Sequence, residues 1–315
     1  MLENSRLRVF REVARRRSFR RAAEVLYLTQ PAITQNIKAL EAELGRRLFD
    51  REGGRVGLTL AGEVLLEVAE RSEEVLREAE TRLAALEGRV EGQLAIAAST
   101  TIAQYVLPRL LGSFAKRYPG VTLQLESSNT EVVVERVAVG GAALGLIEGP
   151  AHRPDLQLER WMTDELVAVV PARHAWAGRE IPPAALREAT LLMREQGSGS
   201  RAVLEAALRA AGVPLETLRV GMELGSTEAL LACVEAGLGV GFASRFALRR
   251  QRRLGTLATV RLTGVRVRRE LRLLCRRGPP GGGPVEAFAE HLRLYAMRRA
   301  ARLGAREGVV EAMGE

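Results

Sequence analysis

The sequence is poor in the residue types that build catalytic, metal and redox sites. Its two cysteines, Cys233 and Cys275, lie alone in apolar segments, which favours small buried thiols over a redox pair. Its three histidines are scattered, and none has a partner at the spacing that metal ligands need. No serine, cysteine or pair of carboxylates stands in a catalytic arrangement. We therefore predict a protein that is not an enzyme and that holds no metal and no cofactor.

Long apolar runs are absent too. No run approaches the roughly 20 residues that span a bilayer, and the N-terminus lacks the pattern of a signal peptide. We therefore expect a cytoplasmic protein without a membrane partner. The 315 residues leave room for about two or three domains, and a hydrophobic content of 47% is ample for packed cores.

Residues 18–49 carry the most informative pattern, which predicts two short helices joined by a tight turn. Apolar residues recur at helical spacing in each half, at Phe19, Ala22, Ala23 and Leu26 and then at Ile33, Ile37, Leu40 and Leu44. Thr29 is a good N-cap for the second helix, and Pro31 is tolerated in the turn that follows. The apolar stripe must pack inward, so Pro31, Thr34, Gln35 and Lys38 point outward, with Gln30 at the tip of the helix.

This outward face has the chemistry that a DNA major groove requires. Amides such as Gln35 form bidentate hydrogen bonds with base edges, and a cation such as Lys38 pairs with backbone phosphate. We therefore predict that Gln30, Pro31, Thr34 and Gln35 read bases. The alternative is a pair of ordinary core helices with a solvated polar face.

The flanking sequence favours the DNA-binding interpretation and predicts a winged helix-turn-helix over residues 1–59. A third apolar helical pattern precedes the pair, and a Gly-centred turn between short extended arms follows it. The first 60 residues hold thirteen basic and seven acidic residues, so +6 of the chain's net +9 lies there. Such a concentration of positive charge is typical of a nucleic-acid-binding domain. The residues that we expect on phosphates are Arg20, Arg21, Lys38, Arg51 and Arg55.

The first seventy residues resemble the N-terminal domain of the LysR-type transcriptional regulators, in the segments LRVFREVA, SFRRAAEVL, TQPAITQNIKALEAELGRRLFDR and LTLAGEVLL. Thr29 and Thr34 stand where the family more often has serine, and Gln35 stands where it often has arginine. The last departure leaves the operator sequence open. The resemblance implies double-stranded operator DNA as a partner, a second copy of this chain, and RNA polymerase.

Residues 60–88 predict a linker helix. The pattern continues to Leu86 without proline, which gives a rod of roughly 40 Å. Its mainly apolar seam, which includes Ser72, steps by three and four as in a coiled coil, at Leu65, Val68, Ser72, Val75, Ala79, Leu83 and Leu86. The resemblance implies that this helix pairs with that of a second subunit, as a dimer and further as a tetramer. The alternative is a helix that lies on its own domain.

From residue 89 to 298 short apolar runs alternate with helical patterns, which is typical of α/β units on a mainly parallel sheet. Ligands bind such sheets beyond the carboxyl ends of the strands. Hydroxyls and glycines gather where strands lead into helices, at Ser99, Thr100, Thr101, Ser128, Asn129, Thr130, Gly197, Ser198, Gly199, Ser200, Arg201, Ser226 and Thr227. One such cluster alone is more often a helix N-cap. Four together predict a site for a small anion, an oxyanion or a carboxylate, because helix N-termini offer unpaired N–H groups.

The run at 194–201 is similar to the Arg-Glu-Pro-Gly-Ser-Gly-Thr-Arg run of the LysR-type branch that contains regulators of sulfur assimilation and carbon fixation, with Gln196 and Ser200 as replacements. The resemblance implies an effector domain with the two-lobed fold of periplasmic solute-binding proteins. We expect lobe I at 92–164 and 268–298, lobe II at 165–267, and a frayed or peripheral tail at 299–315. Arg201 has an alternative role, clamping its helix to a neighbouring carboxylate.

Two other classes of protein compete with an effector-responsive regulator. One is a cytoplasmic solute-binding or anion-activating enzyme domain whose helical cap does not read DNA. The other is a nucleoid-like architectural protein that binds DNA without sequence preference. Deleting residues 1–88 tests the first, and competition with random DNA at a stated salt concentration tests the second.

Overall fold

The computed structural model describes residues 4–52, 55–86, 90–277 and 283–312. The chain divides into two compact units, Met1–Leu83 and Ala84–Glu315, which are described separately. Within the described ranges no helix is both long enough and apolar enough to cross a membrane.

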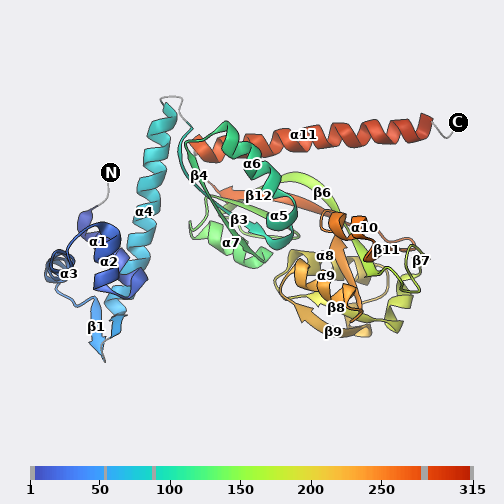
Figure 1. Cartoon of the computed structure of the whole chain (residues 1–315), viewed down its shortest axis with the longest axis horizontal. Helices are drawn as coiled ribbons and strands as arrows, with labels where there is room; N and C mark the ends of the chain where they lie inside the picture. The colour runs from blue at the N-terminus through green and yellow to red at the C-terminus, as the bar shows by residue number, and fades with distance from the viewer. Residues whose placement is uncertain (1–3, 53–54, 87–89, 278–282, 313–315) are drawn as a thin grey trace. The chain divides into compact units, whose positions relative to one another are not determined.

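The first unit is a winged helix-turn-helix followed by a long helix (Figure 1), as the sequence predicts. Its elements are α1 (Ser5–Arg16), α2 (Phe19–Leu26), α3 (Gln30–Leu44), β1 (Phe49–Glu52), β2 (Arg55–Leu58) and α4 (Leu60–Leu86). The Thr29 hydroxyl accepts a hydrogen bond from the Ala32 N–H and caps α3. The core packs around Phe49, whose ring centroid lies 5.4 Å from that of Phe10 and 5.6 Å from that of Phe19.

Two apolar residues do not lie where their spacing predicts. Leu44 is 46% exposed, because α3 ends at Gly45 and its last turn extends past the core that Ile33, Ile37 and Leu40 fill. Leu65, expected on the outer seam of α4, instead packs against the core of the first unit. Helical spacing identifies an apolar stripe, but it does not say which neighbour covers each residue of the stripe.

The start of α4 is fixed by a threonine and a glycine. The Thr59 hydroxyl accepts from the Gly62 N–H at 3.0 Å and donates to the Arg47 carbonyl at 2.7 Å. A side chain at Gly62 would not fit, since its Cβ would lie 2.2 Å from the Leu48 carbonyl oxygen. The Leu-Thr-x-Ala-Gly sequence therefore sets where α4 leaves the wing.

The second unit is a two-lobed α/β domain, again as predicted, built on one continuous ten-stranded sheet. The strands are β3 (Gly92–Ser99), β4 (Val121–Ser128), β5 (Leu144–Glu148), β6 (Leu156–Pro171), β7 (Glu180–Ile181), β8 (Thr190–Arg194), β9 (Arg219–Leu224), β10 (Val240–Ser244), β11 (Leu257–Leu262) and β12 (Val267–Arg276). Their main order is β4-β3-β5-β12-β6-β10-β8-β9, while β11 pairs with β6 and β7. The long strands β6 and β12 cross from one lobe to the other, so the chain passes between the lobes twice.

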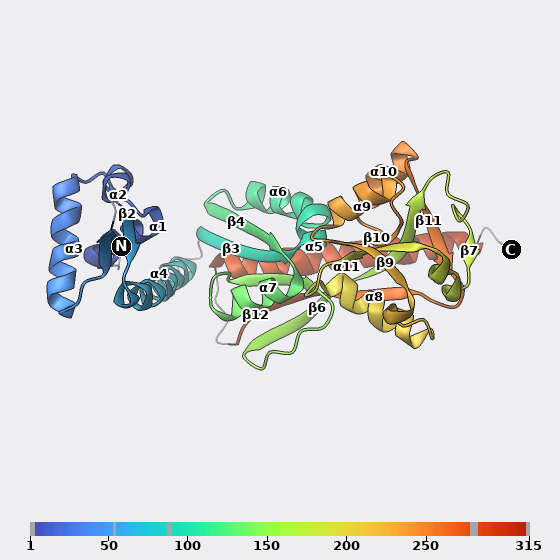
Figure 2. The ribbon, with the colours of Figure 1, turned by 90° about the horizontal axis from the view of Figure 1, so that it is seen from below.

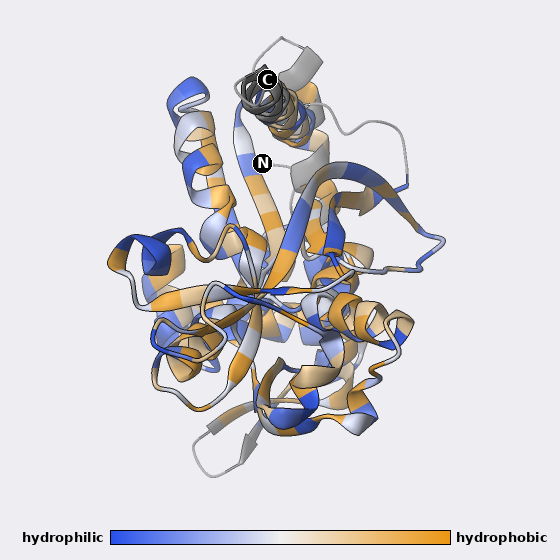
Figure 3. Ribbon diagram, turned by 90° about the vertical axis from the view of Figure 1, so that its right-hand side faces the viewer, coloured by the Kyte–Doolittle hydropathy of each residue, from blue (hydrophilic) through white to orange (hydrophobic). Residues whose placement is uncertain are grey.

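Helices cover both lobes, as Figure 2 shows. The described helices are α5 (Thr100–Tyr105), α6 (Leu107–Arg117), α7 (Thr130–Ala138), α8 (Gly199–Ala210), α9 (Thr227–Glu235), α10 (Arg249–Leu254) and α11 (Gly283–Ala312). In Figure 3 both the strands and the helices carry apolar and polar stretches. Each lobe has its own core, and the lobe I core closes under Phe288 and Leu292 of α11.

The apolar runs in the sequence did not indicate β7, β9, β11, α10, the first ten residues of β6 or the first four of β12. All six residues of β9 lack full burial, and α10 reads RRQRRL, so neither shows the apolar pattern on which the prediction depends. The expected tail at 299–315 does not begin as a separate segment, because α11 continues through position 298 to Ala312.

Cys233 and Cys275 are both free and only partly buried, and burial raises the pKa of the Cys275 thiol.

Candidate functional site

The outward face of α3 has the composition that the sequence predicts. Gln30, Pro31, Gln35 and Lys38 are exposed, and the half-buried Thr34 donates its hydroxyl to the Gln30 carbonyl at 3.0 Å. These five residues line one shallow surface hollow. The structure therefore brings together all four predicted base-reading residues with Lys38 beside them.

The structure describes only some of the side chains that we expect to contact phosphate. Arg20 is exposed and pairs with Glu24 at 3.2 Å on the same helix, and Arg21 is exposed next to it. Arg51 and Arg55 lie on β1 and β2, but their side chains are outside the described residues.

Tyr27, in the turn between α2 and α3, is a residue that the sequence analysis missed. Its side chain is 95% exposed, and its backbone has φ of 53°, in the left-handed region. That region disfavours residues with a large side chain, and glycine or asparagine adopts it at lower cost. The phenol of Tyr27 is therefore exposed at the surface of the turn that precedes α3. The signal in the sequence was the break in apolar spacing at this position.

An exposed apolar row runs along α4. It consists of Leu60, Val64, Val68, Val75 and Leu83, which are 56–79% exposed, and we call it the linker row. Of the predicted seam residues between them, Ser72 is exposed and Ala79 is half-buried, while the Leu86 side chain lies outside the described residues.

Ion pairs hold the opposite side of α4 to the DNA-binding domain. Arg11, whose side chain is only 6% exposed, lies 2.7 Å from Glu73, and Arg15 lies 3.2 Å from Glu70. The linker helix and the helix-turn-helix are thus joined by charge as well as by the packing of Leu65.

In the second unit, two predicted serines converge on one buried carboxylate. Ser99 Oγ, at the end of β3, donates to Glu148 Oε2, and Ser200 Oγ, in the first turn of α8, donates to Glu148 Oε1 at 3.2 Å. Arg269 Nη1 lies 3.3 Å from Glu148 Oε1 and donates to Ser200 Oγ at 2.7 Å, and Arg269 Nη2 lies 2.8 Å from Asp164 Oδ2. The side chains of all three charged residues are at most 2% exposed. We call these five residues the Glu148 network.

A second polar junction lies between α5 and α9. The hydroxyls of Thr101 and Thr227 are 3.2 Å apart, and the buried Arg194 donates to Thr227 Oγ1 at 2.9 Å. The Arg194 guanidinium also makes two hydrogen bonds, of 2.7 and 2.8 Å, to the Glu195 carboxylate. Burial and the hydrogen bond that Tyr105 donates to Glu228 raise the pKa of this phenol above its ordinary value.

Several predicted residues serve as helix caps. Asn129 accepts from the Val132 N–H at the start of α7, and Ser226 accepts from the Ala229 N–H at the start of α9. Ser128 is half-buried beside Asn129, and Thr100 is buried in the first turn of α5. The capping roles of Asn129 and Ser226 match the ordinary interpretation of a hydroxyl cluster.

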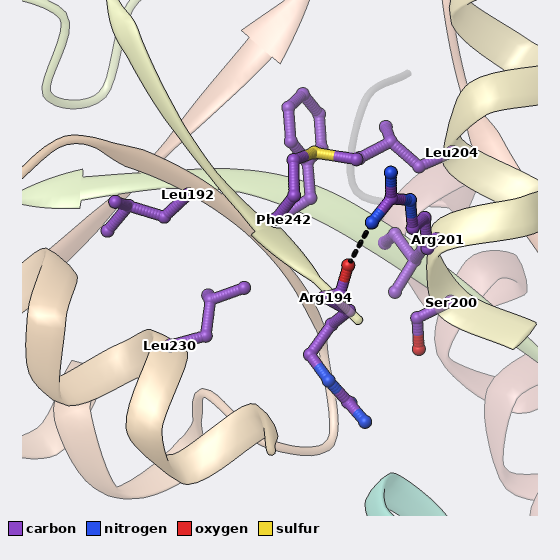
Figure 4. Close-up of a pocket in the computed structure, with 9 residues that line it drawn as sticks. Leu192, Arg194, Ser200, Arg201, Leu204, Leu230 and Phe242 are labelled. Carbon is purple, nitrogen blue, oxygen red and sulfur yellow. Dashed lines mark hydrogen bonds between the residues drawn. The ribbon is translucent and has the colours of Figure 1, made fainter. Parts of the chain in front are cut away.

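Arg201 is engaged within lobe II. Its guanidinium donates to Glu205 Oε1 at 2.7 Å, to the Arg194 carbonyl at 3.0 Å (Figure 4) and to Glu223. It therefore ties α8 to β8 and β9, which is the alternative role that the sequence left open.

Two concave regions adjoin these groups. The one in Figure 4 has a volume of only about 10 Å³, room for one water, between Arg194, Ser200 and Arg201 and a mostly apolar wall. The other is an open cleft of about 650 Å³ between α7 and α8, which Thr130, Gly197, Ser198 and Gly199 help to line. Ser99, Thr101 and Thr227 do not line the open cleft, so the predicted effector residues divide between a buried junction and an open surface.

The charged partners at the junction escaped the sequence analysis. Glu148, Asp164 and Arg269 each stand within or next to an apolar strand pattern, at no mutual spacing that marks a site. Arg194 was noted only as the first residue of the run at 194–201. The only available signal was a charged residue inside a segment that otherwise predicts a buried strand.

Comparison with known protein families decides the identity. Residues 5–63 match the family described as "Bacterial regulatory helix-turn-helix protein, lysR family", and residues 87–296 match "LysR substrate binding domain". The chain belongs to the LysR family of transcriptional regulators. It is a DNA-binding regulator with an effector domain and not an enzyme. The resemblance, the prediction of a DNA-binding regulator and the prediction that the protein is not an enzyme are therefore confirmed.

Named relatives of this LysR-family chain include the RuBisCO operon transcriptional regulators of Allochromatium vinosum and Acidithiobacillus ferrooxidans. The first is 36% identical over 299 residues, which is 95% of this chain and 98% of the relative. The second is 34% identical over 287 residues, 91% and 92% of the two chains.

Two solved structures are also similar. Full-length CbnR complexed with its target DNA has a TM-score of 0.71 at 26% identity, with 93% of this chain and 99% of that chain covered. The regulatory domain of Synechocystis PCC6803 CcmR in complex with 2-PG has a TM-score of 0.60 at 27% identity, over 65% of this chain and 97% of that domain.

Proposed function

We propose that this LysR-family regulator binds its operator as a homo-oligomer and responds to a small anionic metabolite that binds between the lobes of its effector domain. The observation that supports the anion is the arrangement of donors around the Glu148 carboxylate. Ser99, Ser200 and Arg269 together supply two hydroxyls and a guanidinium, the groups that bind oxyanions and carboxylates in proteins.

The relatives suggest which anions to test first. Two of them carry names as regulators of RuBisCO operons, and the CcmR domain was solved with 2-PG, which is 2-phosphoglycolate. We propose that this chain regulates carbon-fixation genes, with RNA polymerase as a further partner, and that its effector belongs to the same class of small phosphorylated or carboxylated acids.

Calorimetry on the full chain tests this function directly. We expect heat of binding with at least one of sulfate, sulfite, phosphate, 2-phosphoglycolate and small carboxylates, and a shift of operator affinity equivalent to about 1–3 kcal/mol when that anion saturates the protein. Binding of only neutral or cationic compounds would exclude the anion class.

Replacing Gln35 by alanine tests base reading. The exposed Gln35 amide on α3 should read a base, so operator affinity should fall by about 1–3 kcal/mol while affinity for random DNA changes little. Lys38→Ala is the matched control on the same face. It should weaken both DNAs alike and reduce the slope of log affinity against log salt by about one. Equal losses on both DNAs in the Gln35 variant would show that the residue does not read bases.

Replacing Tyr27 by asparagine separates stability from DNA binding at the turn. Asparagine tolerates the left-handed backbone better than tyrosine, so the thermal midpoint should stay the same or rise. Loss of the exposed phenol should nevertheless weaken binding to operator and random DNA alike, by about 1 kcal/mol. Tyr27→Phe isolates the hydroxyl. Unchanged DNA titrations with both variants would leave Tyr27 without a role at the DNA.

A further inference from the structure

The Glu148 network carries one more negative charge than positive charge. Glu148 and Asp164 supply two carboxylates, and Arg269 supplies the one guanidinium that lies between them. Burying an ionised carboxylate is unfavourable unless partners compensate it. Arg269 and Asp164 alone would form a balanced pair, so the stability of the fold does not require Glu148 to be charged.

Glu148 is also the point at which the two lobes meet. Its two carboxylate oxygens accept from Ser99 of lobe I and Ser200 of lobe II. The backbone carbonyl of Glu148 accepts a hydrogen bond from Thr130 Oγ1 at 2.9 Å. The same carbonyl lies close to Gly199, since a Cβ at position 199 would stand 1.7 Å from its oxygen. These contacts fix the backbone of Glu148 against the first turn of α8.

The first turn of α8 is a position that favours negative charge. The N-cap residue, Ser198, makes no side-chain capping hydrogen bond, so the N–H groups at this end of the twelve-residue helix lack a side-chain cap. The Glu148 carboxylate, bound to Ser200 in that turn, supplies the negative charge from within the chain.

We propose that Glu148 is a built-in competitor of the effector: its carboxylate occupies the donors that an anionic effector uses, and the effector binds by displacing it. This inference rests on the proposed function. On displacement, Ser99, Ser200 and Arg269 exchange the Glu148 carboxylate, which is part of lobe I, for the effector, which is not attached to either lobe. The contact between the lobes then changes with binding, which couples the effector to the arrangement of the lobes. Glu148 thus sets both the affinity for the anion and the resting contact between the lobes.

Replacing Glu148 by glutamine tests the competition. Glutamine has the same shape, can still accept a hydrogen bond, and leaves Arg269 balanced by Asp164, so the variant should fold. Removal of a like charge a few ångströms from the ligand should tighten binding of inorganic phosphate and of 2-phosphoglycolate by about tenfold or more. Glu159→Gln is the matched control, since Glu159 is an ionised residue of the same lobe that pairs with Arg293 of α11 at 2.7 Å. It should bind the anions as the unchanged protein does.

A second variant covers the case in which Glu148→Gln does not fold. Glu148→Asp keeps the charge but shortens the side chain, so the carboxylate no longer reaches both hydroxyls. Its anion affinity should also exceed that of the unchanged protein. A purely structural role for Glu148 predicts unchanged or weaker binding in both variants.

The outcomes separate this inference from the proposed function. If the unchanged protein binds an anion and the folded Glu148 variants bind it equally or more weakly, the competition is overturned. The proposed class of effector then still stands. Binding by Glu148→Gln alone would support the competition. No binding of any tested anion by the unchanged protein or the variants would overturn both.

Discussion

With glutamate in place of Val75, the protein should sediment as a monomer at concentrations where the unchanged protein is an oligomer. Val75 is 64% exposed in the middle of the linker row, and among the described residues none of the row packs into the core of the first unit. If the row pairs with that of a second subunit, the new carboxylate enters an apolar interface without a partner. That costs about 3 kcal/mol or more, which raises the dissociation constant by roughly a hundredfold. Val68→Glu should act in the same way.

The matched control keeps position 75 neutral. Val75→Ala loses two methyl groups but introduces no charge, so the oligomer should persist with a modest loss of affinity. Operator affinity should fall with the glutamate variants because a single half-site supplies too few contacts. Sedimentation of an intact oligomer with both glutamate variants would place the subunit contact outside the linker row.

Features that depend on local sequence could be predicted well. The N-cap at Thr29, the outward set on α3 and the extent of α4 all follow from propensity and spacing within some 30 residues, and the structure contains each of them. The hydroxyl clusters at strand ends could be found for the same reason, because a strand followed by a capped helix is a local signal.

What escaped prediction depends on the fold as a whole. Glu148, Asp164 and Arg269 come from β5, β6 and β12, which are neighbours in the sheet but are separated by up to 121 positions along the chain. Their partnership exists only once β6 and β12 cross between the lobes. Leu65 escaped for a related reason, since its burial depends on the helix-turn-helix that packs beside it.

The predicted effector residues also divide into those with local contacts and those with contacts that depend on the whole fold. Asn129 and Ser226 perform the local task, capping a helix. Ser99 and Ser200 share a carboxylate with each other, although 101 positions separate them. A hydroxyl that contacts a distant charged residue is a better candidate for effector binding than one that caps its own helix, because its partner can be exchanged for a ligand without unwinding the helix.

Ser99→Leu should abolish the response to the anion. The Ser99 side chain is 1% exposed and its hydroxyl donates to Glu148, so leucine both removes a donor and fills the space beside it. Binding of the operator without effector should persist, since the reading face of α3 lies in the other compact unit. Ser99→Thr retains the hydroxyl and is the matched control, with a response between those of the unchanged protein and the leucine variant. Operator titrations with and without saturating 2-phosphoglycolate or phosphate measure both quantities. An undiminished response in the leucine variant would show that the effector binds away from the buried junction, and would direct attention to the open cleft between α7 and α8.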